Sequence, residues 1–295
     1  MSSIRHKVII LGSSGFIGSA VLRRLQKAND LDVVGYTSSS LDLSQPDAWK
    51  KLSELLNPKT ILIVAARSRG TDIPLDALQT DIAIASNVGK CLERTQVHKC
   101  IYFSSTSVYG TTMSNLNVTE ETEPHPTLLY GIGKLASEYI LSNIARKHGI
   151  DLAILRVCMV YGPDDRGDAY GPTKFIRSIR QNQEVRLFGD GRERRNYIFV
   201  EDLAQITETF VVNDQKGIFN VASDDNCSFL EIVDYLQEIM PDKFEIRSVG
   251  RDQAKIDQKI NCEKLKAVLQ GFLFTPFEEG LRITCGASVN AVKIK

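Results

Sequence analysis

Tyr130 and Lys134 have the residue types and the spacing of a proton-transferring pair. They form the pattern Y-x-x-x-K at the start of a helix expected over about residues 128–148, and a separation of four places both side chains on one helical face. A phenol with its ordinary pKa of about 10 is a poor acid or base at neutral pH. A neighbouring ammonium favours the phenolate and lowers that pKa. We therefore expect Tyr130 to exchange a proton with a substrate oxygen.

Hydroxyl groups that could assist this pair lie about 25 residues earlier, in the run Ser104-Ser105-Thr106-Ser107. This run follows an expected strand at 100–103. Ser105 is the expected donor of a hydrogen bond to the substrate oxygen, where it would stabilise developing charge. Thr106 is a second candidate for substrate contact, and Ser104 and Ser107 are competing hydroxyls. The predicted catalytic residues are Ser105, Tyr130 and Lys134.

A second Y-x-x-x-K pattern runs from Tyr170 to Lys174. The chain has nine tyrosines, so one such pattern arises easily by chance. Pro172 interrupts this copy, which lies in a stretch rich in Gly and Pro over 162–172 and has no suitable serine-rich strand end before it. We therefore assign the chemistry to the first copy.

A glycine-rich turn from Gly12 to Gly18 is expected to bind a dinucleotide. It follows an apolar strand over 8–11 and opens a helix over about 15–27. Gly12 permits the tight turn, Gly15 lets the backbone approach a pyrophosphate, and Gly18 lets helix and strand pack closely. The helix N-terminus offers free N–H groups and a favourable dipole to the anion. The expected cofactor contacts in this turn are Gly12, Ser14, Gly15, Phe16, Ile17 and Gly18.

The end of the second expected strand bears on the choice between NAD and NADP. An NAD enzyme usually places Asp or Glu there to bind the ribose 2′-hydroxyl. The stretch over 35–40 reads Gly-Tyr-Thr-Ser-Ser-Ser, so no acid would repel a 2′-phosphate. Ser38 and Ser39 are expected cofactor contacts, and Arg23 or Arg24 could lie within reach of the phosphate. NADP is therefore favoured, with NAD as the alternative.

These residues must be positioned by alternating strands and helices. Apolar strands are expected at 8–11, from 33, and at 61–64, 100–103 and 152–155, and helices at 15–27, 46–56 (with Pro46 in its first turn), 75–96 and 128–148. This alternation predicts an α/β fold, a Rossmann-type doubly wound parallel sheet with helices on both faces. Residues 1–160 would form the dinucleotide-binding domain, with parts of 190–225 returning to it. Residues 161–295 would form a smaller, discontinuous C-terminal α/β domain that binds substrate.

Composition argues against several other classes of protein. The 295 residues carry a formal net charge of zero, which gives no general attraction to nucleic acid or to an anionic membrane. Six cysteines without a C-x-x-C pair and four scattered histidines predict neither a metal site nor a disulfide framework. The sequence shows no membrane-spanning stretch and no signal peptide. We therefore expect a cytoplasmic protein without a metal.

Taken together, the G-x-x-G-x-x-G turn and the order Ser, Tyr, Lys resemble the extended branch of the short-chain dehydrogenase/reductase superfamily. The resemblance is to its nucleotide-sugar epimerase/dehydratase group and covers almost the whole chain. Further matching features are Asn87, Arg156 and the segments EETEPHPTLLYGIGK (120–134), FGDGRERRNYIFVEDLA (188–204), FNVAS (219–223) and FTPFEEGL (274–281).

The resemblance implies an NAD(P)-dependent enzyme with Ser105, Tyr130 and Lys134 as its catalytic triad. Tyr130 and Lys134 are also expected to contact the cofactor, where Lys134 can hold the hydroxyls of the nicotinamide ribose. It implies that Asp42 and Leu43 flank the adenine, with Asp42 accepting a hydrogen bond from the amino group, and that the cofactor also contacts Ala65 and Ala66. The alternative for Asp42 is a loop cap before the Pro46 helix. The resemblance also suggests a homodimer formed through the helix that carries Tyr130 and the helix before it.

A nucleotide-sugar substrate needs cations for its diphosphate. Arg195 takes the position whose arginine contacts that group in the family, and its planar fork suits two phosphate oxygens. Arg251 is a second candidate contact, whereas Arg192 and Arg194 are expected to form a solvated rim. Met159 stands where many relatives have Asn, so one usual polar contact is missing. Asp202 is expected only to cap or begin a helix.

The two residues directly after Ser105 narrow the reaction. The 4,6-dehydratases carry an Asp-Glu pair there for the proton transfers of water elimination, whereas this chain has Thr106-Ser107, which argues against dehydration. Reduction of a 4-keto sugar by NADPH is favoured, because the acid after the second strand is missing. The alternatives are a 4-epimerase with tightly bound NAD, another small carbonyl or hydroxyl substrate, and a non-catalytic NADP-sensing module.

Overall fold

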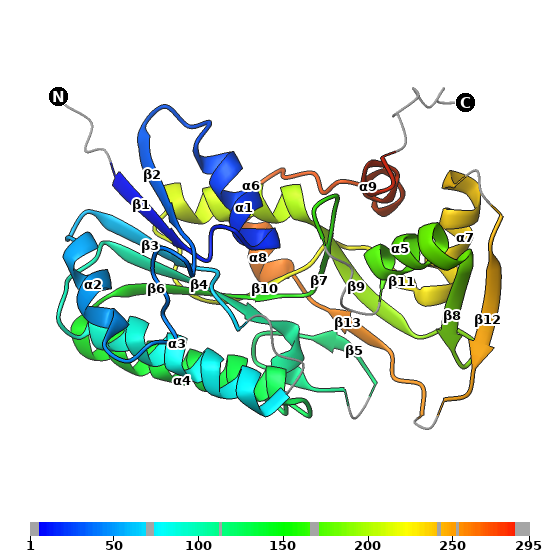
Figure 1. Ribbon diagram of the computed structural model, residues 1–295, viewed down its shortest axis with the longest axis horizontal. Coiled ribbons are helices and arrows are strands. Elements are labelled where there is room, and N and C mark those ends of the chain that lie inside the picture. Colours follow the sequence, from blue (N-terminus) through cyan, green and yellow to red (C-terminus); the bar gives the residue numbers. More distant parts are fainter. Residues whose placement is uncertain are drawn as a thin grey trace.

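The computed structural model describes residues 6–68, 74–111, 114–165, 171–240, 243–251 and 254–286. Its largest element is a six-stranded sheet with the strand order β10-β6-β4-β3-β1-β2, in which every neighbouring pair is parallel (Figure 1). The strands are β1 (His6–Leu11), β2 (Leu31–Tyr36), β3 (Thr60–Val64), β4 (Lys99–Ser105), β6 (Asp151–Val157) and β10 (Gly217–Val221). The chain moves outward from β1 to β2 and then crosses back to β3. The carboxyl ends of these three strands therefore border a topological switch point, where ligands bind in open α/β sheets.

Helices cover both faces of this sheet (Figure 1). One face carries α1 (Phe16–Leu25) and α6 (Val200–Val212), and the other carries α2 (Ala48–Leu55), α3 (Pro74–Leu92) and α4 (Leu129–His148). The strands are largely apolar because most of their side chains pack into a core on each side, one around Ile10 and Ile101 and one around Ile9 and Cys100. The expected doubly wound parallel sheet of Rossmann type is confirmed.

The start of the second helix differs from the expectation. Pro46 does not lie in its first turn, because α2 begins at Ala48. Asp47 before it adopts a left-handed conformation with φ of 62°, and the Ala48 N–H donates to the carbonyl of Gln45 at 3.3 Å. Pro46 thus belongs to a turn that precedes the helix, where its missing N–H is equally harmless.

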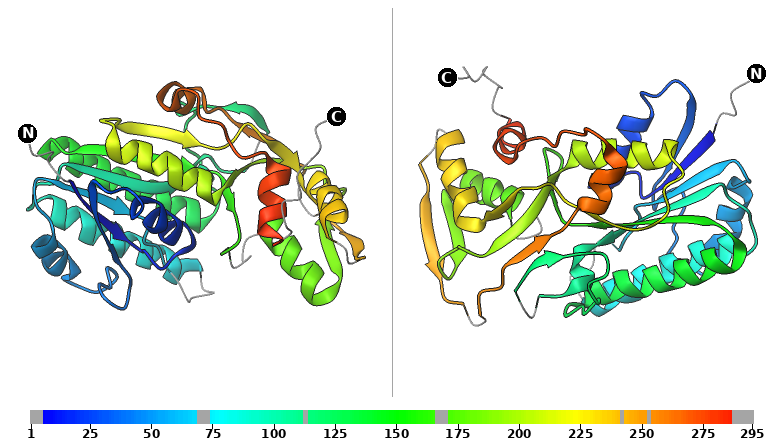
Figure 2. Two further views of the ribbon diagram at one scale, coloured as in Figure 1. Left: turned by 90° about the horizontal axis from the view of Figure 1, so that it is seen from above. Right: turned by 180° about the vertical axis from the view of Figure 1, so that it is seen from behind.

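A smaller group of elements lies beside one end of the sheet, away from the N-terminus (Figure 2). Three short sheets pair β7 (Met159–Tyr161), β9 (Arg194–Phe199) and β11 (Asn226–Ser228), β8 (Glu184–Phe188) with β12 (Glu245–Val249), and β5 (Asn115–Val118) with β13 (Gln258–Ile260). The helices here are α5 (Pro172–Asn182), α7 (Phe229–Ile239) and α9 (Phe277–Thr284), with α8 (Glu263–Leu269) against β10. A separate core around Tyr161 and Tyr197 holds this group together. Between its segments the chain returns to the main sheet as α6 and β10.

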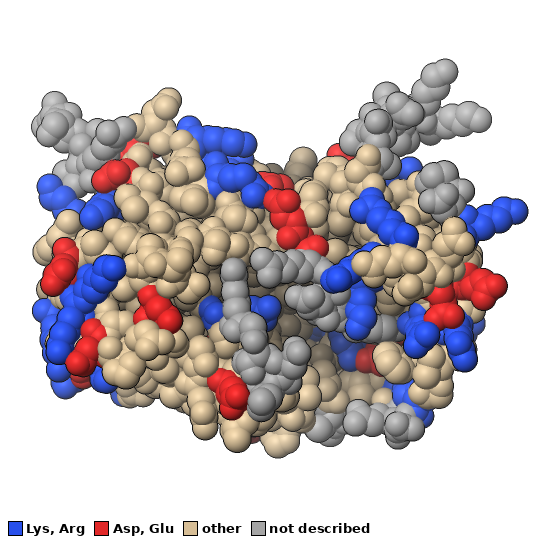
Figure 3. All heavy atoms as spheres, in the orientation of Figure 1, with Lys and Arg blue, Asp and Glu red and all other residues tan. Residues whose placement is uncertain are grey.

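The surface carries both charges. Acidic and basic side chains are interspersed on the face shown in Figure 3. Among the described residues, no helix combines the length and the apolar character that crossing a bilayer requires.

Candidate active site

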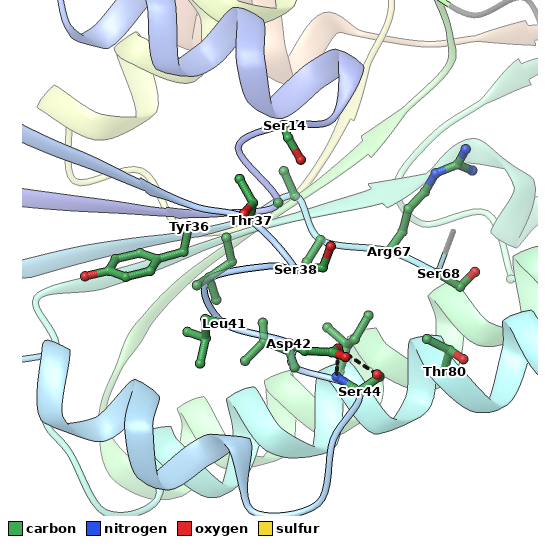
Figure 4. Close-up of a pocket in the computed structure, with 16 residues that line it drawn as sticks. Ser14, Tyr36, Thr37, Ser38, Leu41, Asp42, Ser44, Arg67, Ser68 and Thr80 are labelled. Atoms are coloured by element: carbon green, nitrogen blue, oxygen red, sulfur yellow. Dashed lines mark hydrogen bonds between the residues drawn. The ribbon is translucent and has the colours of Figure 1, made fainter. Parts of the chain in front are cut away.

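A groove opens at the switch point and is lined by the carboxyl ends of β1, β2 and β3 (Figure 4). Gly12 and Ser14 come from the turn after β1, Thr37 and Ser38 from the turn after β2, and Ala65, Ala66 and Arg67 from the segment after β3. We call this the sheet-end groove. It brings together half of the predicted cofactor contacts, from three separate parts of the chain.

The glycine turn has the close packing that its spacing predicts. Gly12 has φ of +85°, and a Cβ there would lie 2.6 Å from the N atom of Ala66. A Cβ on Gly18 would collide with the carbonyl oxygen of Gly12. Both positions therefore require glycine, one for the turn and one for contact between helix and strand. Gly15 is the N-cap residue of α1 and offers no side-chain cap, which leaves the first N–H groups of that helix for an anion. Phe16 and Ile17 begin the helix beside the groove.

The turn after β2 carries hydroxyl groups that bond to one another. The hydroxyls of Thr37 and Ser39 lie 2.7 Å apart, and the Ser40 hydroxyl accepts from the Thr37 N–H at 2.9 Å. Ser38 faces the groove, whereas Ser39 is not among the residues that line it. Lys51, which the sequence did not single out, reaches this turn from α2, and its Nζ donates to the Ser40 carbonyl at 2.8 Å.

The expectation that Arg23 or Arg24 could reach this turn is wrong. Both lie at the far end of α1 and pair with other elements. Arg23 contacts Asp164 at 3.0 Å and Glu201 at 3.4 Å, and Arg24 contacts Glu208 on α6 at 2.7 Å. Packing of α1 against α6 directs this end of the helix away from the groove.

Asp42 lines the groove and also caps a turn, so the two interpretations of this residue are compatible. Its carboxylate accepts from the N–H and the hydroxyl of Ser44 at 3.0 and 2.7 Å (Figure 4). These hydrogen bonds lower the pKa of Asp42 and keep it an acceptor. Leu43 lies beside it in the groove, and Asn87 of α3 donates to the Leu43 carbonyl at 2.9 Å. The buried amide thus fixes this part of the wall.

Arg67 is a groove residue that the sequence reasoning missed. It directly follows Ala65 and Ala66, so its place at the carboxyl end of β3 could have been noticed. Figure 4 shows the Arg67 side chain extending away from Asp42, toward the end of the groove where Ser14 lies. It is therefore a cation on the side of the groove where α1 begins.

Lys134 of α4 reaches the main chain near the carboxyl end of β4. Its ammonium is buried and donates to the Phe103 carbonyl at 2.8 Å. It lies 5.1 Å from the ring centre of Tyr102 and 5.9 Å from that of Tyr130. Burial alone would lower the pKa of Lys134, but the nearby Tyr102, Tyr130 and Asp81 outweigh burial and raise it. Lys134 is thus a fixed positive charge beside the Tyr130 ring.

The segments that carry Tyr130 and Ser105 pack together where α4 begins. Tyr130 is the second residue of the helix and is 39% exposed, so its ring can reach a bound molecule. Gly131 packs so closely on the turn after β4 that a Cβ would lie 2.5 Å from the Ser107 carbonyl oxygen. Ser105 ends β4, and its hydroxyl accepts from the Ser107 N–H at 3.1 Å. Thr106 comes next, in the short 3-10 helix η1 (Thr106–Tyr109). The structure therefore brings the three predicted catalytic segments together.

A buried ion pair behind these residues was not predicted. Glu138 of α4 and Arg156 of β6 are paired at 2.7 Å and almost inaccessible to solvent. Ser104 donates to the same carboxylate, and Tyr109 accepts from Arg156 at 2.9 Å. Glu138 continues the helical row of Tyr130 and Lys134, and an Arg within an apolar strand signals a buried partner. Because its hydroxyl already donates to Glu138, Ser104 is less available than Ser105 to donate a hydrogen bond to a substrate oxygen.

A second pocket lies among the smaller sheets and contains both predicted diphosphate contacts. Arg195 of β9 and Arg251, just after β12, line it together with Met159, Phe188 and Phe229. We call it the arginine pocket. Glu193, which the sequence reasoning passed over, lies in it and pairs with both arginines.

Nearby charged residues have other partners. Arg192 is 72% exposed, and its Nε lies 4.0 Å from the Asp190 carboxylate. This exposure agrees with the expected place of Arg192 in a solvated rim. Arg194 instead ties β9 to neighbouring elements through Glu231 at 3.1 Å. Asp202 lies in the first turn of α6, where it accepts from the N–H and the hydroxyl of Thr275.

The rejected second Y-x-x-x-K copy is described only in part, because Tyr170 lies outside the described residues. Lys174 lies in the first turn of α5, a helix that begins at Pro172 and packs on β8.

Comparison with known proteins agrees with this architecture. Residues 8–222 match the model of a family described as the NAD dependent epimerase/dehydratase family. A putative UDP-glucose 4-epimerase of Methanocaldococcus jannaschii is 26% identical over 78% of this chain and 81% of its own. A GDP-L-fucose synthase of Dictyostelium discoideum is 22% identical over 95% and 94%. The UDP-glucuronic acid 4-epimerase of Bacillus cereus, solved with UDP-glucuronic acid and NAD, superimposes with a TM-score of 0.83, 21% identity and coverage of 95% and 98%.

Proposed function

The chain belongs to the NAD-dependent epimerase/dehydratase family, and we propose that within it this protein reduces the keto group of a 4-keto nucleoside-diphosphate sugar with NADPH. The observation that supports the proposal is that α4, which bears Tyr130 and Lys134, packs against β4, which ends at Ser105 two strands from β1. A dinucleotide whose adenosine lies between Ser38 and Asp42 would extend past Ser14 and Arg67 toward these residues. The reacting ring would then lie beside Tyr130.

Each residue of the triad has a separate part in the chemistry. NADPH would supply the hydride to C4 of the sugar. Ser105 would donate a hydrogen bond to the C4 oxygen, and Tyr130 would give that oxygen its proton as negative charge develops. Lys134, anchored on the Phe103 carbonyl, would stabilise the resulting phenolate. Thr106 would contact the sugar, and neither Thr106 nor Ser107 could act as the acid of a dehydration.

Recognition of the diphosphate is assigned to the arginine pocket. Arg195 and Arg251 place two guanidinium groups in one cavity lined also by apolar Phe229 and Phe188. Guanidinium forks suit phosphate oxygens, and an aromatic wall suits a nucleobase or a sugar ring. A nucleoside-diphosphate sugar combines these features.

The preference for NADPH rests on the acid-free turn over 37–40 and on Lys51 beside it. We expect Lys51→Met to reduce the preference for NADPH over NADH about five-fold, the effect of losing an exposed charge pair of ~1 kcal/mol. The control is Lys50→Met. Because Lys50 pairs with Asp47 at 3.0 Å, its loss should leave the preference for NADPH over NADH unchanged. Values of kcat/KM for both cofactors give the answer. Equal loss with NADPH and NADH in Lys51→Met would show that Lys51 does not contact the 2′-phosphate.

A 4-epimerase is the second candidate, favoured by the names of two of the proteins compared above. An epimerase would hold NAD tightly through a full catalytic cycle, whereas a reductase must exchange its cofactor. Mass spectrometry of nucleotide released on denaturation separates the two. Our proposal predicts no stoichiometric NAD in the purified protein, and stoichiometric NAD would favour the epimerase.

We also propose a homodimer formed through α3 and α4, which pack along each other on one face of the sheet (Figure 1). Large apolar side chains are exposed on these helices at Leu75, Ile132 and Tyr139. An apolar surface on paired helices suits a symmetric helical interface. Sedimentation should give the mass of two chains, and Tyr139→Glu should shift it toward one chain. A wild-type protein that sediments as a single chain at micromolar concentration would contradict this assembly.

A further inference from the structure

Glu193 occupies the space between the two arginines that line the arginine pocket. One carboxylate oxygen pairs with Arg195, and the other lies 2.9 Å from Nη2 of Arg251. All three side chains are only 16% exposed. A single carboxylate thus bridges both guanidinium groups in a partly desolvated place, where charged hydrogen bonds are strong.

The arginines are also held by the main chain. Arg195 donates to the carbonyl groups of Arg194 and Ile256, and Arg251 donates to that of Phe188 at 3.1 Å. These bonds do not involve Glu193. The two guanidinium groups would therefore keep their places if the carboxylate moved away.

We propose that Glu193 is a resident anion, which the diphosphate of the substrate displaces from between Arg195 and Arg251. This inference rests on the proposed binding of a nucleoside diphosphate. With Glu193 in place, the side chains of Glu193, Arg195 and Arg251 carry a net charge of +1. This charge is too small to neutralise a diphosphate. When its side chain turns out of the pocket, both positive charges face the ligand. Its return on product departure satisfies the arginines again, so Glu193 weakens binding in order to permit release.

The experiment measures binding of inorganic pyrophosphate by calorimetry, at one pH and one low ionic strength. Pyrophosphate carries the proposed chemistry without a base or a sugar. Glu193→Gln keeps the shape of the side chain and removes the competing charge. We expect pyrophosphate to bind this variant about ten-fold more tightly than the wild-type protein, the effect of removing roughly 1.4 kcal/mol of competition.

Glu184→Gln is the matched control. Glu184 also lies between two arginines, Arg186 at 2.5 Å and Arg247 at 3.8 Å, but these belong to the ribbon formed by β8 and β12. Glu184 is not among the residues that line the arginine pocket. Pyrophosphate affinity should not change in this variant.

Each outcome bears on the inference. Unchanged or weaker binding by Glu193→Gln would overturn it, because the carboxylate would then position the arginines instead of competing with the ligand. The inference would also be overturned if neither the wild-type protein nor Glu193→Gln bound pyrophosphate, even if the wild-type protein reduced the sugar. Tighter binding by Glu193→Gln in a protein without sugar reductase activity would support the anion exchange and refute the proposed reaction.

Discussion

Replacement of Tyr130 by Phe is expected to lower kcat for sugar reduction by about 10³-fold, with the Kd for NADPH changed by less than about two-fold. The phenol is the proposed proton donor to C4–O⁻, and Phe keeps the ring but not the proton. Lys134 should stay in place, because its Nζ is anchored on the Phe103 carbonyl at 2.8 Å. Oxidation of NADPH measures kcat, and fluorescence titration measures cofactor binding.

The control for this variant is Tyr139→Phe. Tyr139 lies on the same helix and is 61% exposed, so it tests whether loss of any phenol from α4 affects the rate. Its kcat should match the wild-type value. A Tyr130→Phe protein with near-normal kcat would show that another group protonates the sugar oxygen.

Replacement of Glu138 by Gln is expected to lower the free energy of unfolding by about 3–5 kcal/mol. The change leaves the Arg156 guanidinium buried without its counter-charge, since the Arg156 side chain is only 3% exposed. In the native protein the Glu138 carboxylate outweighs the effect of burial and raises the pKa of Arg156. Without Glu138 the guanidinium still keeps its proton, because an arginine is not deprotonated in proteins, so the buried charge remains uncompensated. Unfolding in urea, followed by circular dichroism, gives the difference.

Glu208→Gln provides the comparison for a pair that is only partly buried. Glu208 contacts Arg24 at 2.7 Å near the surface, and loss of such a pair changes the unfolding free energy by at most about 1 kcal/mol. Equal, small losses in both variants would mean that the Glu138–Arg156 pair does not hold α4 against β6. A large loss in Glu138→Gln alone is the result that we expect.

Local patterns predicted the parts of this protein that depend on neighbours in sequence. Apolar runs such as Ile61 to Val64 became buried parallel strands, because both faces of the sheet are covered. Gly12 and Gly18 were predictable because contact between a strand and the next helix depends on a few residues only. Spacing on one helix likewise placed Tyr130 and Lys134 together.

Local sequence patterns could not predict the pairings between residues of distant segments. Arg23 and Arg24 looked available for a phosphate, but packing of α1 on α6 paired them with acids about 140 to 185 residues away. Glu193 lies within the segment over 188–204, yet its pairing with Arg251 depends on contact between the residues before β9 and the residues after β12. In each case the partner of the charged residue depends on how helices and strands pack. Local patterns in a single sequence do not predict that packing.

The central claim is that hydride passes from exchangeable NADPH to C4 of a nucleotide-linked keto sugar. Incubation of the protein with NADPH deuterated at the transferred position and a 4-keto sugar nucleotide tests it directly, with the product analysed by mass spectrometry and NMR. Our account predicts one deuterium on C4 and one NADPH consumed for each product molecule. An isomerised sugar without deuterium, formed while NADPH stays intact, would contradict it.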